Sequence, residues 1–372
     1  MGVIIPLLLI LISSIIIWKS SDGFDYASSY LGRNLTDGVK GATINAISSS
    51  MPELLTSFFF LIFLKDAVGF SGGLGTVAGS AVFNAMVIPA LSIIAVIYFG
   101  VAKSIQVSKK VIYRDSFALI ILQLALIGIL YFQMLNWMGG LLLVSLYVIY
   151  IFYMFYTMEN SSSKSEFETS STVEKVNNKF ISFLKLDFYK ALIGDSKINT
   201  LNAILLLFVS LLFMGGSCLI LVWACELIGE KEYSFFGYEG LIGLNLPISA
   251  VAIIIAAAAT SVPDTILSIK DALKGNFNDA ISNAIGSNVF DIGFALGFPV
   301  LIYSLLYEPI ILNESIQDFS INIMLILLFL TLATFIVLVS SKKIGLTRGI
   351  ILLFFYFIFI IYILTSVSYG GN

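Results

Sequence analysis

The chain has 372 residues, of which 59% are hydrophobic and only 12% are charged. Soluble domains contain about 25% charged residues, so this composition excludes a soluble globular protein. The chain contains no histidine, which excludes His-based catalysis and His metal ligands. A formal net charge of −3 gives no reason to expect a nucleic-acid partner.

Apolar stretches long enough to cross a bilayer recur along the whole chain. A membrane-spanning helix needs about 20 predominantly apolar residues. The stretch from Ser116 to Met158 holds two spans, joined at Asn136 to Gly140. The predicted fold class is therefore an all-α integral membrane protein with ten transmembrane helices. In chain order they lie at residues 2–18, 41–64, 72–99, 115–134, 138–158, 200–226, 240–269, 279–306, 319–340 and 347–367.

Lysine and arginine predict the orientation of these spans. With the N-terminus outside, 18 of the 20 basic residues fall in cytoplasmic loops, and only Lys65 and Lys231 lie outside. Basic residues concentrate on the cytoplasmic side of membrane proteins. We therefore expect a multi-pass protein of the cell membrane, with both termini outside and the segment 159–199 in the cytoplasm.

The ten spans divide into two sets of five. Because five is an odd number, the second set enters the membrane upside down, and residues 1–158 and 200–372 form two inverted repeats. Residues 159–199 form a linker between them. We expect this linker to be partly disordered from Ser161 to Asn178, and to form an amphipathic interfacial helix from Phe180 to Lys190.

Two short motifs, one in each half, resemble each other. The first, within residues 41–90, reads Ser49-Ser50-Met51-Pro52-Glu53, followed by Gly79-Ser80-Ala81-Val82-Phe83-Asn84. The second, within residues 250–300, reads Thr260-Ser261-Val262-Pro263-Asp264, followed by Gly286-Ser287-Asn288-Val289-Phe290-Asp291. Ionisable residues inside a membrane are costly and usually functional. A matched pair predicts one ion site at the interface between the repeats.

The first acid of each motif has no basic partner at its depth. Glu53 lies 13 residues after Lys40 and 12 before Lys65, near the middle of its span. An ionised and unpaired carboxylate there would be very unfavourable, so Glu53 must be protonated or bind cations, and we favour cations. Only five residues separate Asp264 from Lys270. Either its helix breaks at Pro263 or Asp264 faces a water-filled vestibule.

The candidate ligands in these motifs are all oxygen atoms. Ser80 and Asn84 are four residues apart and share a helix face, as do Ser287 and Asp291. The proline before each acid cannot donate a backbone hydrogen bond, which leaves carbonyl oxygens free in the preceding turn. Calcium takes six to eight oxygen ligands, and two carboxylates supply its charge. Soft metals are disfavoured because no Cys, Met or His cluster accompanies the acids.

At these motifs the chain resembles the calcium/cation antiporter superfamily, in particular its sodium/calcium exchangers. The second motif resembles the potassium-dependent branch most. The resemblance implies a central calcium site at Glu53 and Asp264, with backbone carbonyls of Ser49 and Thr260. It also implies that the first and sixth spans slide across the others to alternate access. It implies sodium sites that share the two acids with Ser50, Ser80, Asn84, Ser261, Ser287 and Asp291.

The predicted function is secondary active exchange of sodium for calcium across a cell membrane. Calcium and sodium would be cargo, and potassium is a further candidate. We expect no enzymatic activity, no cofactor and no obligatory protein partner besides the lipid bilayer. No ATP-binding motif is present, so an ion gradient must supply the energy.

Three alternatives differ in chemistry. A proton/calcium antiporter would carry an Asn-Ala-x-Glu type of motif instead of Ser-x-Pro-Glu. An intramembrane aspartyl protease would use Asp264 and Asp291, but its Gly-x-Gly-Asp motif is missing at Gly73-Leu74-Gly75-Thr76. A passive channel would show flux without an obligatory counter-ion.

Charge counting leaves two roles open for Asp291. With Glu53 and Asp264 it gives three negative charges if all are ionised. Three sodium ions neutralise them, whereas one calcium ion leaves one charge uncompensated, which is costly in a site of low dielectric constant. A bound potassium ion or a proton on Asp291 would remove it. We favour the proton, so we expect exchange that does not require potassium.

Overall fold

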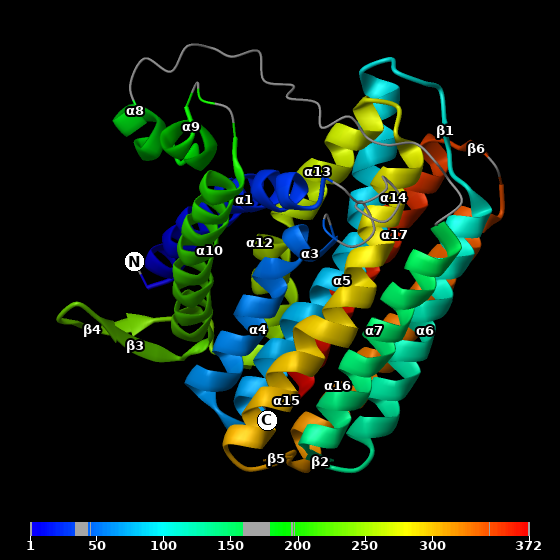
Figure 1. Ribbon diagram of the computed structural model, residues 1–372. Coiled ribbons are helices and arrows are strands. Elements are labelled where there is room, and N and C mark those ends of the chain that lie inside the picture. The colour runs from blue at the N-terminus through cyan, green and yellow to red at the C-terminus, as the bar shows by residue number, and fades with distance from the viewer. Residues whose placement is uncertain are drawn as a thin grey trace.

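A computed structural model describes residues 2–33, 44, 46–158, 179–194, 196, 198–341 and 343–370, and it is largely helical (Figure 1). The helices of the first half are α1 (Ile4–Leu31), α3 (Ala46–Ser49), α4 (Met51–Leu64), α5 (Asp66–Tyr98), α6 (Lys109–Leu130) and α7 (Trp137–Met158). Two short helices follow, α8 (Lys179–Leu184) and α9 (Phe188–Leu192). The second half contains α10 (Thr200–Gly229), α11 (Ile248–Val251), η2 (Ala252–Ala256), α12 (Ala257–Thr260), α13 (Val262–Leu273), α14 (Phe277–Phe290), η3 (Asp291–Leu296), α15 (Gly297–Leu306), α16 (Glu314–Val339) and α17 (Leu346–Gly370).

The helices define a membrane protein, as the sequence predicts. Within the described ranges, eight helices are long and apolar enough to cross a membrane, or nine if the bent pair Ile248–Thr260 and Val262–Leu273 counts as one span. Helix α4 is apolar but has only 14 residues. The all-α membrane fold is confirmed, while the count of ten spans stays a prediction in which α3 and α4 together form the second span.

Helix α1 is longer than the predicted span 2–18, because it continues to Leu31 through part of the expected loop. Apart from Phe24, its last turns bury small residues such as Ser20, Ser21, Gly23 and Ala27, so a hydropathy pattern does not detect them. Gly23 faces Ser210 of α10, and Ala27 belongs to a small apolar cluster with Phe188 of α9. The extension carries polar side chains past the end of the predicted span.

The seventh span begins later than predicted. Residues 240–247 are not helical, because β3 (Glu232–Phe235) and β4 (Tyr238–Ile242) form an antiparallel hairpin and helix α11 starts only after Pro247. The turn contains Phe236 and Gly237, with φ values of 46° and 85°. Apolar composition alone does not separate a short strand from the end of a helix.

The linker contains two short helices instead of the one predicted from Phe180 to Lys190. Helices α8 and α9 are separated at Leu186, whose φ of 57° is incompatible with a continuous α-helix. Helix α9 packs against α10 and α1, with the Tyr26 and Tyr189 rings 4.1 Å apart. Residues 159–178, where disorder is predicted, lie outside the described residues.

The two halves pair according to a two-fold pattern. The first helices pair with each other, α1 with α10, and so do the fourth, α6 with α16. The fifth helix of each half packs against the third of the other, α17 against α5 and α7 against α15. Short strands of the two halves also pair with each other. Strand β1 (Ile105–Gln106) pairs with β6 (Lys343–Ile344), and β2 (Met134–Leu135) pairs with β5 (Ile310–Ile311).

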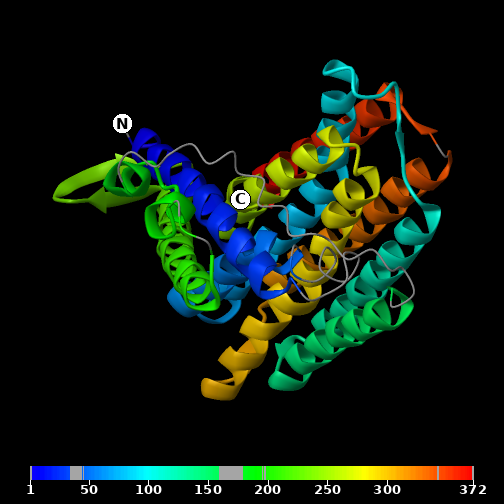
Figure 2. The ribbon, with the colours of Figure 1, turned by 45° about the horizontal axis from the view of Figure 1, so that its top comes forward.

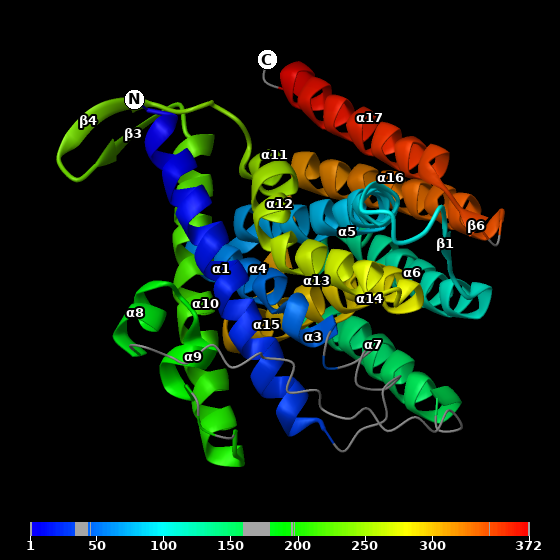
Figure 3. The same cartoon turned by 90° about the horizontal axis from the view of Figure 1, so that it is seen from above.

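The two strand pairs lie at opposite ends of the helix bundle (Figure 1). An operation that exchanges the halves therefore also exchanges the two ends, as expected for inverted repeats. Helices α1 and α10 lie side by side on one side of the molecule (Figures 2 and 3). They pack on α4 and on η2 through a separate apolar cluster that includes Phe60, Met214 and Ala256. The larger core lies around α5 and α14.

Glycines allow helix α5 to lie in the centre of the bundle. The Gly-rich stretch from Gly69 to Gly79 is helical and buried, and the helix begins at Asp66, before the predicted start at residue 72. A Cβ atom at Gly72 would lie 2.7 Å from the Phe60 ring of α4, and one at Gly75 would lie 2.7 Å from the Ser249 carbonyl oxygen. Small side chains permit this close approach between membrane helices.

We predict that Gly79→Ala destabilises the fold whereas Gly286→Ala does not, although the two glycines occupy matched motif positions. A Cβ at Gly79 would collide with the Ile253 carbonyl oxygen and lie 2.6 Å from the Ala257 Cβ. At Gly286 the nearest atom is the Tyr150 hydroxyl at 4.0 Å. Overpacking costs about 1–3 kcal/mol, whereas alanine is the better helix former. Thermal unfolding in detergent should show a lower midpoint for Gly79→Ala only, and equal midpoints would contradict the packing argument.

Candidate cation site

Each acidic motif places its carboxylate just after a kink in a helix. Ser50 separates α3 from α4 with φ −95° and ψ 7°, and Ser261 separates α12 from α13 with φ −79° and ψ 1°. The chain bends by 42° between α12 and α13. Because Pro52 and Pro263 have no N–H, they cannot bond the carbonyl four residues earlier. The two motifs therefore fold into the same local structure.

The kinks place both acids in the first turn of a helix. Glu53 belongs to the first turn of α4, and Asp264 belongs to the first turn of α13. The positive end of each helix dipole stabilises negative charge there. The break before Pro263 is one of the two alternatives that the sequence left open for Asp264. Lys270 forms an ion pair with Asp22 of α1, at 3.6 Å.

All ten residues predicted from the sequence are buried, with exposed fractions of 4% or less. They come from four membrane segments, α3–α4, α5, α12–α13 and α14 with η3, which contact one another in the centre of the bundle. The set consists of Ser49, Ser50, Glu53, Ser80, Asn84, Thr260, Ser261, Asp264, Ser287 and Asp291.

The Ser80 hydroxyl connects the two halves of the site. Its oxygen lies 3.2 Å from Glu53 Oε1, 3.2 Å from Asp291 Oδ2 and 2.9 Å from Ser261 Oγ. A hydroxyl has one proton, so Ser80 can donate to only one of these oxygens at a time. At least one of the Glu53 and Asp291 carboxylates therefore needs a cation or another hydrogen-bond donor.

Asp264 has a fuller set of donors. Asn84 Nδ2 donates to its Oδ2 at 3.1 Å, and Ser287 Oγ donates to its Oδ1 at 3.2 Å. The same amide nitrogen lies 3.3 Å from Ser80 Oγ, which joins the three acids into one polar network. The predicted pairs on shared helix faces, Ser80 with Asn84 and Ser287 with Asp291, thus all face the site.

Ser49 and Thr260 occupy matched positions in the kinked turns. Ser49 Oγ donates to the Ala46 carbonyl at 3.4 Å, and Thr260 Oγ1 donates to the Ala257 carbonyl at 3.2 Å. These hydroxyl groups bond back to their own helices and also interact with the acid of the other motif, Ser49 with Asp264 and Thr260 with Glu53. The backbone carbonyls of Ser49 and Thr260 stay the calcium ligands that the family resemblance predicts.

Several buried oxygen atoms of the site have no hydrogen-bond partner within the described part of the chain: Ser50 Oγ, Glu53 Oε2, Asn84 Oδ1 and Asp291 Oδ1. No Lys or Arg among the described residues forms an ion pair with the three acids. A buried carboxylate oxygen left unpaired is costly. Cations with a preference for oxygen ligands fit this donor set.

The three acids do not converge on a single point. Among the described residues, no group of three Asp, Glu or Cys side chains is close enough to hold one metal ion. Hydroxyl and amide groups separate the carboxylates instead, with Ser80 between Glu53 and Asp291 and Asn84 between Ser80 and Asp264. This favours several neighbouring ion positions, each with few carboxylates, over one with all three.

Sequence reasoning missed a second group of buried polar residues around the site. Thr56 Oγ1 and Asn288 Oδ1 are buried without a partner among the described residues, and Asn288 Nδ2 bonds the Ala81 carbonyl at 2.9 Å. Asn283 donates to Ser268 Oγ at 3.1 Å. Helical spacing could have found them, because Thr56 follows Glu53 by three residues and Ser268 follows Asp264 by four.

A buried, oxygen-lined site between two inverted sets of membrane helices defines a secondary transporter of cations. Comparison with known proteins identifies the transporter. The sequence profile of the family described as "Sodium/calcium exchanger protein" matches residues 5–156 and 202–365. The chain belongs to this family, and it is a multi-pass membrane antiporter of sodium and calcium.

Relatives cover nearly the full chain. Human sodium/potassium/calcium exchanger 5 is 25% identical over 375 residues, covering 80% of this chain and 70% of the relative. A membrane protein of Methanocaldococcus jannaschii is 27% identical over 350 residues, covering 94% of each chain.

Solved structures share the fold. A structure of the sodium-calcium exchanger NCX_Mj has a TM-score of 0.55 at 24% identity, covering 96% of this chain and 97% of the other. The H+/Ca2+ exchanger CAX has a TM-score of 0.60 at 17% identity, covering 98% and 88%. The fold is therefore that of calcium exchangers with different coupling ions.

We predict that Ser80→Ala weakens calcium transport while Ser92→Ala leaves it unchanged. Ser80 contacts both Glu53 and Asp291, whereas Ser92 lies farther along the same helix, equally buried and with no partner among the described residues. Loss of hydrogen bonds to charged groups should raise the KM for calcium about tenfold. Calcium-45 uptake into proteoliposomes gives the values, and an unchanged KM for Ser80→Ala would remove Ser80 from the site.

Proposed function

We propose that this protein exchanges sodium for calcium across a cell membrane by alternating access, using one site built from both halves. Glu53 and Asp264 supply the two negative charges for calcium, assisted by carbonyl oxygens of Ser49 and Thr260. Sodium ions share these acids with Ser50, Ser80, Asn84, Ser261, Ser287 and Asp291.

The observation that carries this proposal is the burial of three carboxylates with unpaired oxygens and no basic partner in the described part of the chain. Bound cations would supply the missing positive charge. Because calcium and sodium compete for the same oxygens, binding of one excludes the other. An antiporter needs this competition, because the transporter should not switch its opening from one side of the membrane to the other while the site is empty.

The shared fold with CAX does not separate sodium from proton coupling, because both exchangers use it. Hydroxyl groups at Ser50, Ser80, Ser261 and Ser287 favour sodium, since they add neutral oxygen ligands around the acids. A proton needs no such ligands. These ligands agree with the sodium/calcium exchange of the family to which the chain belongs, and proton exchange is the alternative that the assay tests.

Several further properties follow as proposals. The protein would have ten spans, divided at residues 158 and 200, with both termini outside and the linker in the cytoplasm. It would act without catalysis, cofactor or obligatory protein partner in the lipid bilayer. The packing of α1 and α10 as a pair beside the larger core supports their predicted sliding as one unit.

We predict that Glu53→Gln and Asp264→Asn each abolish sodium-dependent calcium uptake. Each change removes one of the two charges that neutralise calcium, while the side chain keeps its size. The measurement is calcium-45 uptake into sodium-loaded proteoliposomes, with protons and other cations varied outside. Uptake driven by a pH gradient instead of sodium would support the proton alternative.

The control for these variants is Asp318→Asn, which changes an exposed acid on α16. It should transport like the wild type. Size-exclusion chromatography in detergent confirms that all variants are folded. Near-normal flux in Glu53→Gln or Asp264→Asn would refute the assignment of the site.

We predict that exchange does not require potassium and that Asp291→Asn retains it. Asp291 lies 3.2 Å from Ser80 and is fully buried, with one oxygen unpaired among the described residues. A proton held there would leave two charges for calcium. The test replaces potassium with choline on both sides of the proteoliposome. Flux that collapses without potassium, and that Asp291→Asn restores, would show that potassium is transported.

A further inference from the structure

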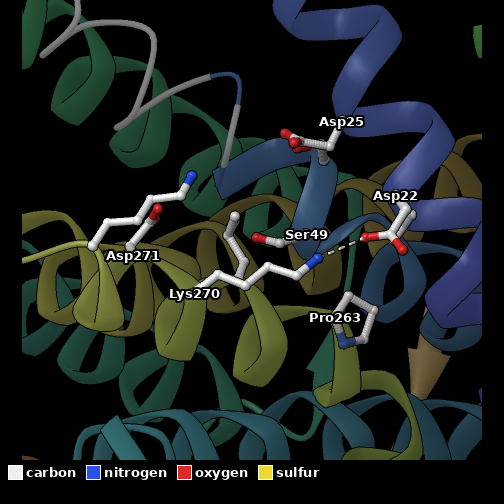
Figure 4. A pocket seen from close by; sticks show the side chains of 10 residues that line it. Asp22, Asp25, Ser49, Pro263, Lys270 and Asp271 are labelled. Carbon is white, nitrogen blue, oxygen red and sulfur yellow. Dashed lines mark hydrogen bonds and ion pairs between the residues drawn. The ribbon is translucent and has the colours of Figure 1, made fainter. Parts of the chain in front are cut away.

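A cavity of about 190 Å³ lies between the end of α1 and helix α13 (Figure 4). Its inner wall includes Ser49 and Pro263, which belong to the two acidic motifs. Its outer wall includes Asp22 and Asp25 of α1 and Lys270 of α13. The cavity therefore connects the kinked turns of the cation site with the surface at this end of the bundle. We call it the vestibule.

The vestibule is lined by opposite charges that come from different helices. Lys270 Nζ lies 3.6 Å from Asp22 Oδ1, and both side chains are about half exposed, at 55% and 45%. Asp25 accepts a hydrogen bond from Ser48 Oγ at 3.1 Å. Asp271 and Lys274 also line the cavity. Three acids thus face two bases, which leaves an excess of negative charge.

A second observation points to a ligand. Ser21 lines the vestibule with an exposed fraction of only 4%, and its hydroxyl oxygen has no hydrogen-bond partner within the described ranges. A buried hydroxyl group normally has a partner. Together with the carboxylates of Asp22 and Asp25, this oxygen provides a set of hard ligands of the kind that calcium or sodium prefers.

We propose that the vestibule is a second, weaker cation-binding site on the path to the buried acids, and that Lys270 competes for it. The site would hold calcium or sodium between Asp22, Asp25 and the Ser21 hydroxyl. When no calcium or sodium ion is bound, the Lys270 ammonium group pairs with Asp22 in the place of the ion. This inference rests on the proposed function, because it assigns the vestibule to the same cargo.

The competition has a functional consequence. A transported cation must displace the ammonium group from Asp22 before it binds there, so Lys270 lowers the affinity of the vestibule. The same ion pair joins α1 to α13, which carries Asp264 in its first turn. Displacing Lys270 therefore loosens α1 from the helix that holds the buried site. Binding of a cation at Asp22 would thus be coupled to the breaking of the ion pair that holds α1 against α13.

The transport test compares Lys270→Gln with Lys274→Gln. Both variants remove one positive charge from the vestibule, but only Lys270 forms an ion pair within the described part of the chain. An ion pair of this exposure is worth at most about 1 kcal/mol, so Lys270→Gln should lower the KM for calcium about two- to fivefold. The effect should appear only with calcium on the vestibule side. Lys274→Gln should have a smaller effect.

The binding test is independent of transport. In the full-length triple variant Glu53→Gln, Asp264→Asn, Asp291→Asn, the buried acids are neutral. Mn²⁺ is the probe, and the loss of its free-ion EPR signal reports binding. We expect the triple variant to bind Mn²⁺ weakly, and added Asp22→Asn and Asp25→Asn to abolish this binding. Added Lys270→Gln should strengthen it, and added Asp318→Asn should change nothing.

The two tests distinguish a failure of the proposed function from a failure of the vestibule proposal. Absent sodium-driven uptake in the wild type would refute the proposed function, while Mn²⁺ binding would still test the vestibule. The vestibule proposal is overturned if Mn²⁺ binding in the triple variant is absent or insensitive to Asp22→Asn and Asp25→Asn. Equal changes in KM on both sides of the membrane, or equal effects of Lys270→Gln and Lys274→Gln, would also overturn it.

Discussion

The burial of carboxylates without basic partners governs the rest of this structure. Glu53, Asp264 and Asp291 are fully buried, and the serine and asparagine groups around them supply too few protons for all their oxygens. In a medium of low dielectric constant, such charges persist only with counter-ions. Helix N-termini and hydroxyl groups stabilise these charges in part. In the proposed function the transported cations neutralise the rest, so stability and cation binding would depend on the same atoms.

This constraint explains features that would otherwise weaken a membrane helix. Prolines at positions 52 and 263 kink the helices and release backbone oxygens, while placing the acids at helix N-termini. Glycines on α5 let η2 and α4 approach closely, so that Ser80 and Asn84 reach across to the acids. Small residues and kinks thus bring charged groups from four segments into hydrogen-bond range.

The pair α1–α10 stands apart from this polar centre. It packs through its own apolar cluster, and the polar contacts that join α1 to the core near the vestibule include the Lys270–Asp22 ion pair and the Ser48–Asp25 hydrogen bond. Apolar contacts tolerate sliding, whereas directed polar contacts define a position. A few exchangeable polar contacts beside the cation path would allow cargo to influence where α1 lies, which links binding to movement without a direct contact between cargo and α10.

The sequence by itself determined the membrane class and most helix positions, and it singled out the ten residues that the structure buries in the polar centre. Their roles in ion binding remain predictions. It could do so because a bilayer forces backbone hydrogen bonds to be satisfied within each helix, so local hydropathy marks the spans, and because acids without bases are conspicuous there. The count of ten spans and their orientation remain predictions. Only the tertiary structure decided that Ser80 connects Glu53 with Asp291, that Lys270 pairs with Asp22, that α1 continues to Leu31 and that residues 238–242 form a strand. Most of these depend on contacts between segments far apart in the chain, which no local pattern encodes.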